Sequence, residues 1–81
     1  MDRIARRPDQ LGAILRAQRR RLKLTQSALA AASGLRQATV SSVEAGEPGT
    51  RLDTILDLLA ALDLELAVRP RSQASDIEDM F

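Results

Sequence analysis

The stretch TQSALAAASGLRQATVSSVEAG, residues 25–46, decides the fold. Thr25 can act as the N-cap of a helix by accepting the first free amide protons, and a short run rich in alanine follows it. Gly34 then supplies the positive φ that turns the chain sharply after two helical turns. A second short helix is predicted from about Gln37, with Val40 and Val43 inward and Gly46 just past its end. Two short helices that meet at a glycine turn form a helix-turn-helix.

One further helix is predicted on each side of this motif. Pro8 suits the first position of a helix, which then runs to about residue 22. After a loop at residues 47–49, Thr50 and Asp53 have the spacing of a capping box that starts a fourth helix. Apolar residues recur at helical spacing in both segments. They are Leu11, Ile14, Leu15 and Leu22 in the first helix, and Leu52, Ile55, Leu56, Leu59 and Leu62 in the fourth.

The apolar period changes from helical to two at Leu64. Leu64, Leu66 and Val68 then alternate with polar or small residues until Pro70, which is the pattern of a strand over residues 64–69. A lone strand leaves its backbone unpaired, so we expect it to pair with the same strand of a second copy. The alternative is that the fourth helix continues through Leu66.

Composition excludes several classes of function. The 81 residues contain no cysteine and no histidine, which excludes disulfides, Cys/His zinc sites and Ser-His relays. The serines have no evident base, so no catalysis, metal or cofactor is expected. The chain has no apolar run long enough for a membrane span and no signal-peptide core, which favours a soluble cytoplasmic protein.

Charge divides the chain into a basic and an acidic half. Residues 1–36 hold nine basic and two acidic residues, whereas residues 37–81 hold three basic and nine acidic residues. This polarity predicts one face for a polyanion and another for a different partner. Residues 1–7 are predicted to form a basic arm, residues 8–70 the domain, and residues 71–81 a disordered acidic tail.

Residues 25–46 resemble the helix-turn-helix of the phage-repressor (Xre-like) family. More narrowly, the run RQATVS at residues 36–41, Pro8 and the strand pattern are similar to HipB-like antitoxins, over residues 8–69. The resemblance implies an all-α, four-to-five-helix, lambda-repressor-like DNA-binding domain whose C-terminal strand pairs across a homodimer. It also implies that Arg19 and Glu44 form an ion pair that holds the first helix to the recognition helix.

The same resemblance implies the roles of the surface residues. The start of the recognition helix enters the DNA major groove, where Arg36 can bind guanine and Gln37 adenine, and the Ala38 methyl can contact thymine. The expected base contacts are Arg36, Gln37, Ala38 and Ser41. The expected phosphate contacts are Gln26, Thr39, Ser42, Arg16, Arg20 and Lys23, and the expected dimer contacts are Leu64, Leu66 and Val68.

The function implied is that of a dimeric repressor that binds a palindromic DNA operator, represses its own operon and binds a HipA-type serine/threonine kinase toxin. Two alternatives stay open. One is a stand-alone phage-type repressor without a toxin partner, and the other is a helical adaptor that binds protein rather than DNA. The sequence leaves the operator and the toxin unidentified.

Overall fold

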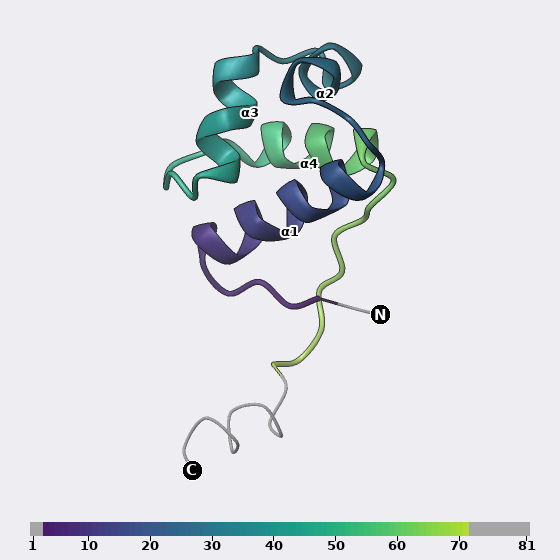
Figure 1. The fold of residues 1–81 in the computed structure, drawn as a ribbon. Helices are drawn as coiled ribbons and strands as arrows, with labels where there is room; N and C mark the ends of the chain where they lie inside the picture. The colour runs from purple at the N-terminus through teal and green to yellow at the C-terminus, as the bar shows by residue number, and fades with distance from the viewer. Residues whose placement is uncertain (1–2, 72–81) are drawn as a thin grey trace.

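Four helices form the framework of residues 3–71, the part of the chain that the computed structural model describes (Figure 1). They are α1 (Pro8–Arg21), α2 (Gln26–Ser33), α3 (Gln37–Glu44) and α4 (Leu52–Ala61). This range contains no strand, and the expected all-α, four-helix domain is confirmed. Pro8 stands at the start of α1 as predicted.

One small apolar core lies between the four helices. α2 packs against both α3 and α4, and α1 packs against α3. Leu15 of α1, Leu29 of α2 and Val40 of α3 are almost completely buried. Full burial of such a side chain contributes roughly 1.5–3 kcal/mol, so a core this small depends on each member. The buried apolar residues are Leu15, Leu29, Ala30, Val40, Val43, Leu58, Leu59 and Leu62.

All four helices end in the same way, with a residue of left-handed backbone. At the end of α1, the amide of Lys23 donates to the carbonyl of Arg20 at 2.9 Å and the amide of Leu24 to that of Arg19 at 3.0 Å. This Schellman pair of hydrogen bonds satisfies carbonyls that the helix leaves free. Two of the four left-handed residues, Lys23 and Asp63, are not glycine. The positions are Lys23, Gly34, Gly46 and Asp63.

The predicted capping box of α4 is wrong. The helix begins at Leu52 with Arg51 as its N-cap, one residue later than the motif requires. The Thr50 hydroxyl donates instead to the carbonyl of Glu47 at 3.4 Å. The Asp53 carboxylate accepts from the Arg51 guanidinium at 3.1 Å and from the amide of Thr54 at 2.9 Å.

The predicted inward face of α4 is partly wrong. Leu59 and Leu62 are buried as expected, but Leu58 completes that face, and Leu52 and Leu56 are 64% and 45% exposed. The stripe that faces the core consists of Ile55, Leu58, Leu59 and Leu62, which have i, i+3, i+4, i+7 spacing. Leu52 and Leu56 lie outside this stripe. The predicted pattern of four leucines and Ile55 was compatible with either rotation of the helix.

The segment after α4 is not helical. α4 ends at Ala61, so the alternative of a helix through Leu66 is wrong. Residues 64–71 adopt neither helix nor strand in this single chain. A strand that pairs between two copies has no partner here, so the predicted pairing stays a prediction. Residues 1–2 of the predicted arm and 72–81 of the predicted tail lie outside the described residues.

Candidate nucleic-acid interface

A turn over residues 34–36 joins α2 to α3. The Thr25 hydroxyl oxygen accepts from the amide of Ala28 at 3.0 Å, which confirms the predicted N-cap. Gly34 has φ 71°, which confirms the predicted left-handed turn. The amide of Leu35 donates to the carbonyl of Ala30 at 2.9 Å, and the Leu35 side chain packs against the core. α3 therefore has a fixed direction relative to α2.

The N-terminal part of α3 presents one edge to solvent. Val40 and Val43 are buried on its inner side, as predicted. The four residues expected to contact bases are all exposed, and Ser42 is exposed beside them, whereas Thr39 is half-buried. Side chains on this edge are free to reach a groove of DNA. The exposed set is Arg36, Gln37, Ala38 and Ser41.

Three cations expected to meet phosphates are also exposed. Arg16 and Arg20 lie on α1, and Lys23 follows it with φ 60°. α1 packs against α3, so this basic helix lies beside the helix that carries the exposed edge. The last turn of α1 also carries Arg19 and Arg21, and cations are favourable at this end of a helix because of its dipole.

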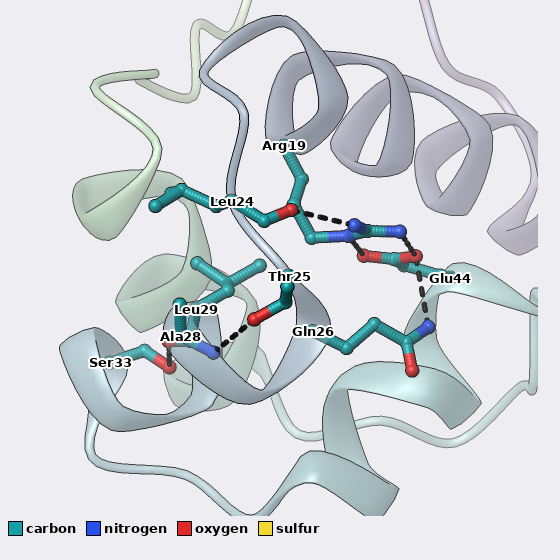
Figure 2. A network of polar contacts seen from close by, with 8 residues as sticks. All are labelled: Arg19, Leu24, Thr25, Gln26, Ala28, Leu29, Ser33 and Glu44. Carbon is teal, nitrogen blue, oxygen red and sulfur yellow. Dashed lines mark hydrogen bonds and ion pairs between the residues drawn. The ribbon is translucent and has the colours of Figure 1, made fainter.

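Arg19 and Glu44 form a bidentate ion pair between α1 and α3 (Figure 2). The Arg19 Nε donates to Glu44 Oε2 at 2.7 Å, and its Nη2 donates to Oε1 at 3.0 Å. The two side chains are only 11% and 4% exposed. Arg19 also donates to the carbonyl of Leu24 at 2.8 Å, so one guanidinium ties α3 to the chain between α1 and α2.

Gln26 joins this pair. Its Nε2 donates to Glu44 Oε1 at 3.2 Å, and Figure 2 shows the amide extended from the start of α2 towards the carboxylate. Burial raises the pKa of Glu44, but hydrogen bonds from Arg19 and Gln26 and the charges of Arg19 and Arg16 outweigh it, so the pKa lies below its ordinary value. Glu44 is therefore held as an anion under a mostly cationic surface.

Two glycines allow α1 to approach the end of α3, and the sequence reasoning missed both of these contacts. A Cβ on Gly12 would lie 2.5 Å from the carbonyl oxygen of Val43 and 2.7 Å from that of Glu44. A Cβ on Gly46 would lie 2.7 Å from the Cα of Asp9. The available signal was a glycine inside an otherwise regular amphipathic helix, which usually marks a close approach.

A shallow hollow adjoins α3 on the side where α4 begins. Thr39 and Ser42 line it from α3, and Thr50 and Arg51 line it from the following loop. No surface role was predicted for Thr50 or Arg51. Arg51 is a cation in the acidic half of the chain, and that isolation was the available signal. Within residues 3–71 there is no cluster of three or more side chains that could hold a metal ion.

A capped α2, a left-handed glycine, an α3 with one exposed edge and a buried bracing pair together define a helix-turn-helix domain. Residues 15–68 match the model of the helix-turn-helix family, and the chain belongs to that family. The family and fold are those of a DNA-binding transcriptional regulator rather than of an enzyme. None of the described helices has the length and hydropathy to span a bilayer.

Similar proteins support this assignment. Over 69 residues the chain is 39% identical to the HTH-type transcriptional regulator y4dL of Sinorhizobium fredii, a match that covers 83% of this chain and 34% of the relative. The chain thus spans about a third of the length of that relative. HipB in a HipA-HipB-O2-O3 complex is 30% identical with a TM-score of 0.79, over 89% of this chain and all of that chain. HipB bound to an O4 20mer is also 30% identical to this chain, with a TM-score of 0.80 over 89% of this chain and all of that chain.

Proposed function

We propose that the chain is a dimeric, sequence-specific DNA-binding repressor similar to HipB antitoxins, and that it binds a palindromic operator in its own operon. The observation that supports this best is the exposed start of α3 on a folded, braced motif. In this geometry Arg36 can bridge O6 and N7 of guanine, and Gln37 can pair with N6 and N7 of adenine. The Ala38 methyl suits a thymine methyl, and Ser41 can bond either base type.

Phosphate contacts would set the register of this readout. Arg16, Arg20 and Lys23 supply cations on α1, and Gln26 supplies an amide at the start of α2, where helix N-termini favour anions. Thr39 and Ser42 lie beside the hollow that Arg51 adjoins. Contacts of this kind raise affinity for any duplex and carry no sequence information.

A second copy would cover the segment after α4. A groove of about 970 Å³ separates residues 64–71 from α1 and the N-terminal segment. Leu66 and Val68 are 56% and 95% exposed in the single chain, while Leu64 packs against the core. Pairing of residues 64–69 between two copies would bury both side chains and satisfy the strand backbone. A two-fold pair would place its α3 helices about 34 Å apart, one turn of DNA.

The proposed partner besides DNA is a HipA-type serine/threonine kinase toxin. Its support is the similarity to HipB in a structure named as a HipA-HipB-O2-O3 complex. The exposed acidic residues Asp57, Asp63 and Glu65, on α4 and just after it, have the opposite charge to the cations of the proposed DNA face. A stand-alone regulator is the second candidate, and the match to a regulator about three times longer favours it.

Two measurements test the proposal. The chain is expressed together with its neighbouring gene, and a kinase-sized protein should copurify. The purified complex should then protect a palindrome in the shared promoter from nuclease. Protection by the chain with no copurifying partner would favour the stand-alone regulator. Weak, sequence-blind binding to every duplex at physiological salt would contradict the repressor and favour a protein adaptor.

The salt dependence of binding tests the phosphate contacts separately. Arg20→Ala should flatten the plot of log affinity against log salt by about one unit, because one fewer counterion is released. An unchanged slope would show that Arg20 faces solvent in the complex.

A further inference from the structure

We infer that Glu44 is a positioning residue for DNA binding, and that it orients the Gln26 amide towards a phosphate. The inference rests on the proposed function, since it concerns how this chain holds a phosphate donor before DNA arrives. It assigns Glu44 a role beyond the ion pair with Arg19. The three side chains form one connected network between α1, α2 and α3 (Figure 2).

The first step of the argument is the position of Gln26. It is the first residue of α2, after the Thr25 cap, and its side chain is half-buried. Thr25 Oγ1 already accepts the amide of Ala28, so the backbone at this end of the helix is fixed. The side chain of Gln26 keeps its rotamer freedom, so its amide can adopt many orientations unless a hydrogen bond restricts it.

The second step is that Glu44 holds this amide. Nε2 has two protons, and the 3.2 Å bond to Glu44 Oε1 uses one of them. The second proton stays available for an oxygen of the DNA backbone. The carboxylate itself is fixed, because two bonds from Arg19 hold it and its side chain is 4% exposed. The orientation of Gln26 is therefore set by a rigid, buried acceptor.

The third step concerns charge. An unpaired carboxylate next to DNA would repel phosphates, but Glu44 is bonded to Arg19 and lies within the electrostatic reach of Arg16. The local group of Arg16, Arg19 and Glu44 keeps a net positive charge. Glu44 can thus orient a donor in a cationic surface without closing that surface to an anion. A donor held in its binding geometry loses less side-chain entropy when it binds.

The test is the cost of Gln26→Ala in three backgrounds, measured as affinity for one duplex at one salt concentration. The backgrounds are the wild-type chain, Glu44→Leu and Arg19→Lys. Glu44→Leu removes both carboxylate oxygens and leaves Gln26 no acceptor at this position, whereas Arg19→Lys weakens the ion pair but leaves the acceptor in place. Each variant is compared at a temperature where it is fully folded. The affinity loss caused by Gln26→Ala is calculated within each background. The effect of the background substitution on overall DNA affinity therefore cancels.

If Glu44 positions Gln26, Gln26→Ala should lower affinity about tenfold in the wild-type and Arg19→Lys backgrounds, as expected for a hydrogen bond to a charged group. In Glu44→Leu the cost should fall below about twofold, because no acceptor at position 44 holds the amide. An equal cost in all three backgrounds, or no cost in the wild type, would overturn the inference. Failure of the wild-type chain to bind any duplex would instead contradict the proposed function.

A second readout needs neither DNA nor a variant at Glu44. The side-chain amide resonances of Gln26 are followed by NMR in the free wild-type chain as the pH is lowered. If the bond exists in solution, these resonances should move together with the carboxyl resonance of Glu44. Gln10, whose Oε1 accepts the amide of Arg6, serves as the control amide and should not follow Glu44. A Gln26 amide that ignores the titration of Glu44 would overturn the inference.

Discussion

Glu44 shows what a single residue contributes to both fold and surface. Its carboxylate accepts three bonds, two from Arg19 and one from Gln26, and it is almost completely buried. Removing one partner of such a pair leaves an uncompensated buried charge, which costs roughly 3–5 kcal/mol. The resemblance implied the pairing with Arg19. It implied a phosphate contact for Gln26 but not the bond between Gln26 and Glu44, because the direction of an amide depends on rotamers that a sequence does not encode.

Acid should weaken the fold through Glu44. Its folded pKa lies below the ordinary 4.5, so its contribution to stability is complete above that value and is lost as the pH falls through the lower folded pKa. We expect the stability difference between the wild-type chain and Glu44→Gln to shrink as pH falls from about 5 to about 2. Urea unfolding at a series of pH values measures this. A difference that stays constant over the range would contradict the expectation.

The base-contact residues should act one position at a time. Arg36→Ala or Gln37→Ala should relax the sequence preference at one base position, at a cost of about 1–3 kcal/mol for the preferred base. Titration against a full set of operator variants measures this. A uniform loss of affinity for all variants would show that the residue contacts backbone rather than a base.

Lys23 holds a left-handed backbone that glycine adopts more easily. Its φ of 60° costs an ordinary side chain about 1 kcal/mol, so Lys23→Gly should raise the free energy of unfolding by that amount. The same change should weaken DNA binding if Lys23 contacts a phosphate. Asp63→Gly is the matched control, because Asp63 ends α4 with φ 59° and should gain stability with DNA affinity unchanged. Lower stability in Lys23→Gly would contradict the argument.

At the scale of elements, α3 is held against α1 by backbone contact. Gly12 brings α1 against the carbonyl groups that end α3, with no room for a methyl group. Gly12→Ala would gain about 1 kcal/mol at an exposed helix position, but here it should cost about 2–3 kcal/mol because the two helices must separate. Denaturant unfolding checks the sign, and a stabilised Gly12→Ala would show that the helices separate freely.

The number and order of the helices followed from the sequence, and their exact rotation did not. Thr25, Gly34 and Gly46 each mark a helix end by local chemistry, so those ends were predictable. α4 has leucines on most of its circumference, and its packing in the core, chiefly against α2, selects the buried stripe. Its N-cap was misassigned because Thr50 and Asp53 have capping-box spacing, whereas in the structure the Thr50 hydroxyl donates to the carbonyl of Glu47.

For the whole molecule, the exposed apolar residues after α4 are the main support for the proposed dimer. Val68→Asp should abolish the proposed dimer, since it places a charge among residues that pairing would bury. In the wild-type chain each tenfold rise in concentration should add about 1.4 kcal/mol to dimer stability and raise the melting temperature. Ala67→Asp, on the other side of the segment, should keep this dependence. A monomer by light scattering at all concentrations would contradict dimerisation.

The part of the candidate site that lies on a single helix was predictable from the sequence. The residues proposed to contact bases lie at the start of α3, and all of them are exposed. Contacts that depend on how separate elements meet were not predictable, because they require the packing of α1, α3 and the loop before α4. Gly12 and the hollow beside Arg51 are of this kind.

Because of the contact at Gly12, the residues that hold α3 against α1 differ from those proposed to contact bases. This contact joins peptide groups near the end of α3, so the exposed side chains at the start of that helix take no part in it. Positions 36, 37, 38 and 41 can therefore be randomised together without changing how α3 packs against α1. A library built at these four sites should yield mostly folded members with many different target preferences, which makes this small scaffold suitable for reprogramming.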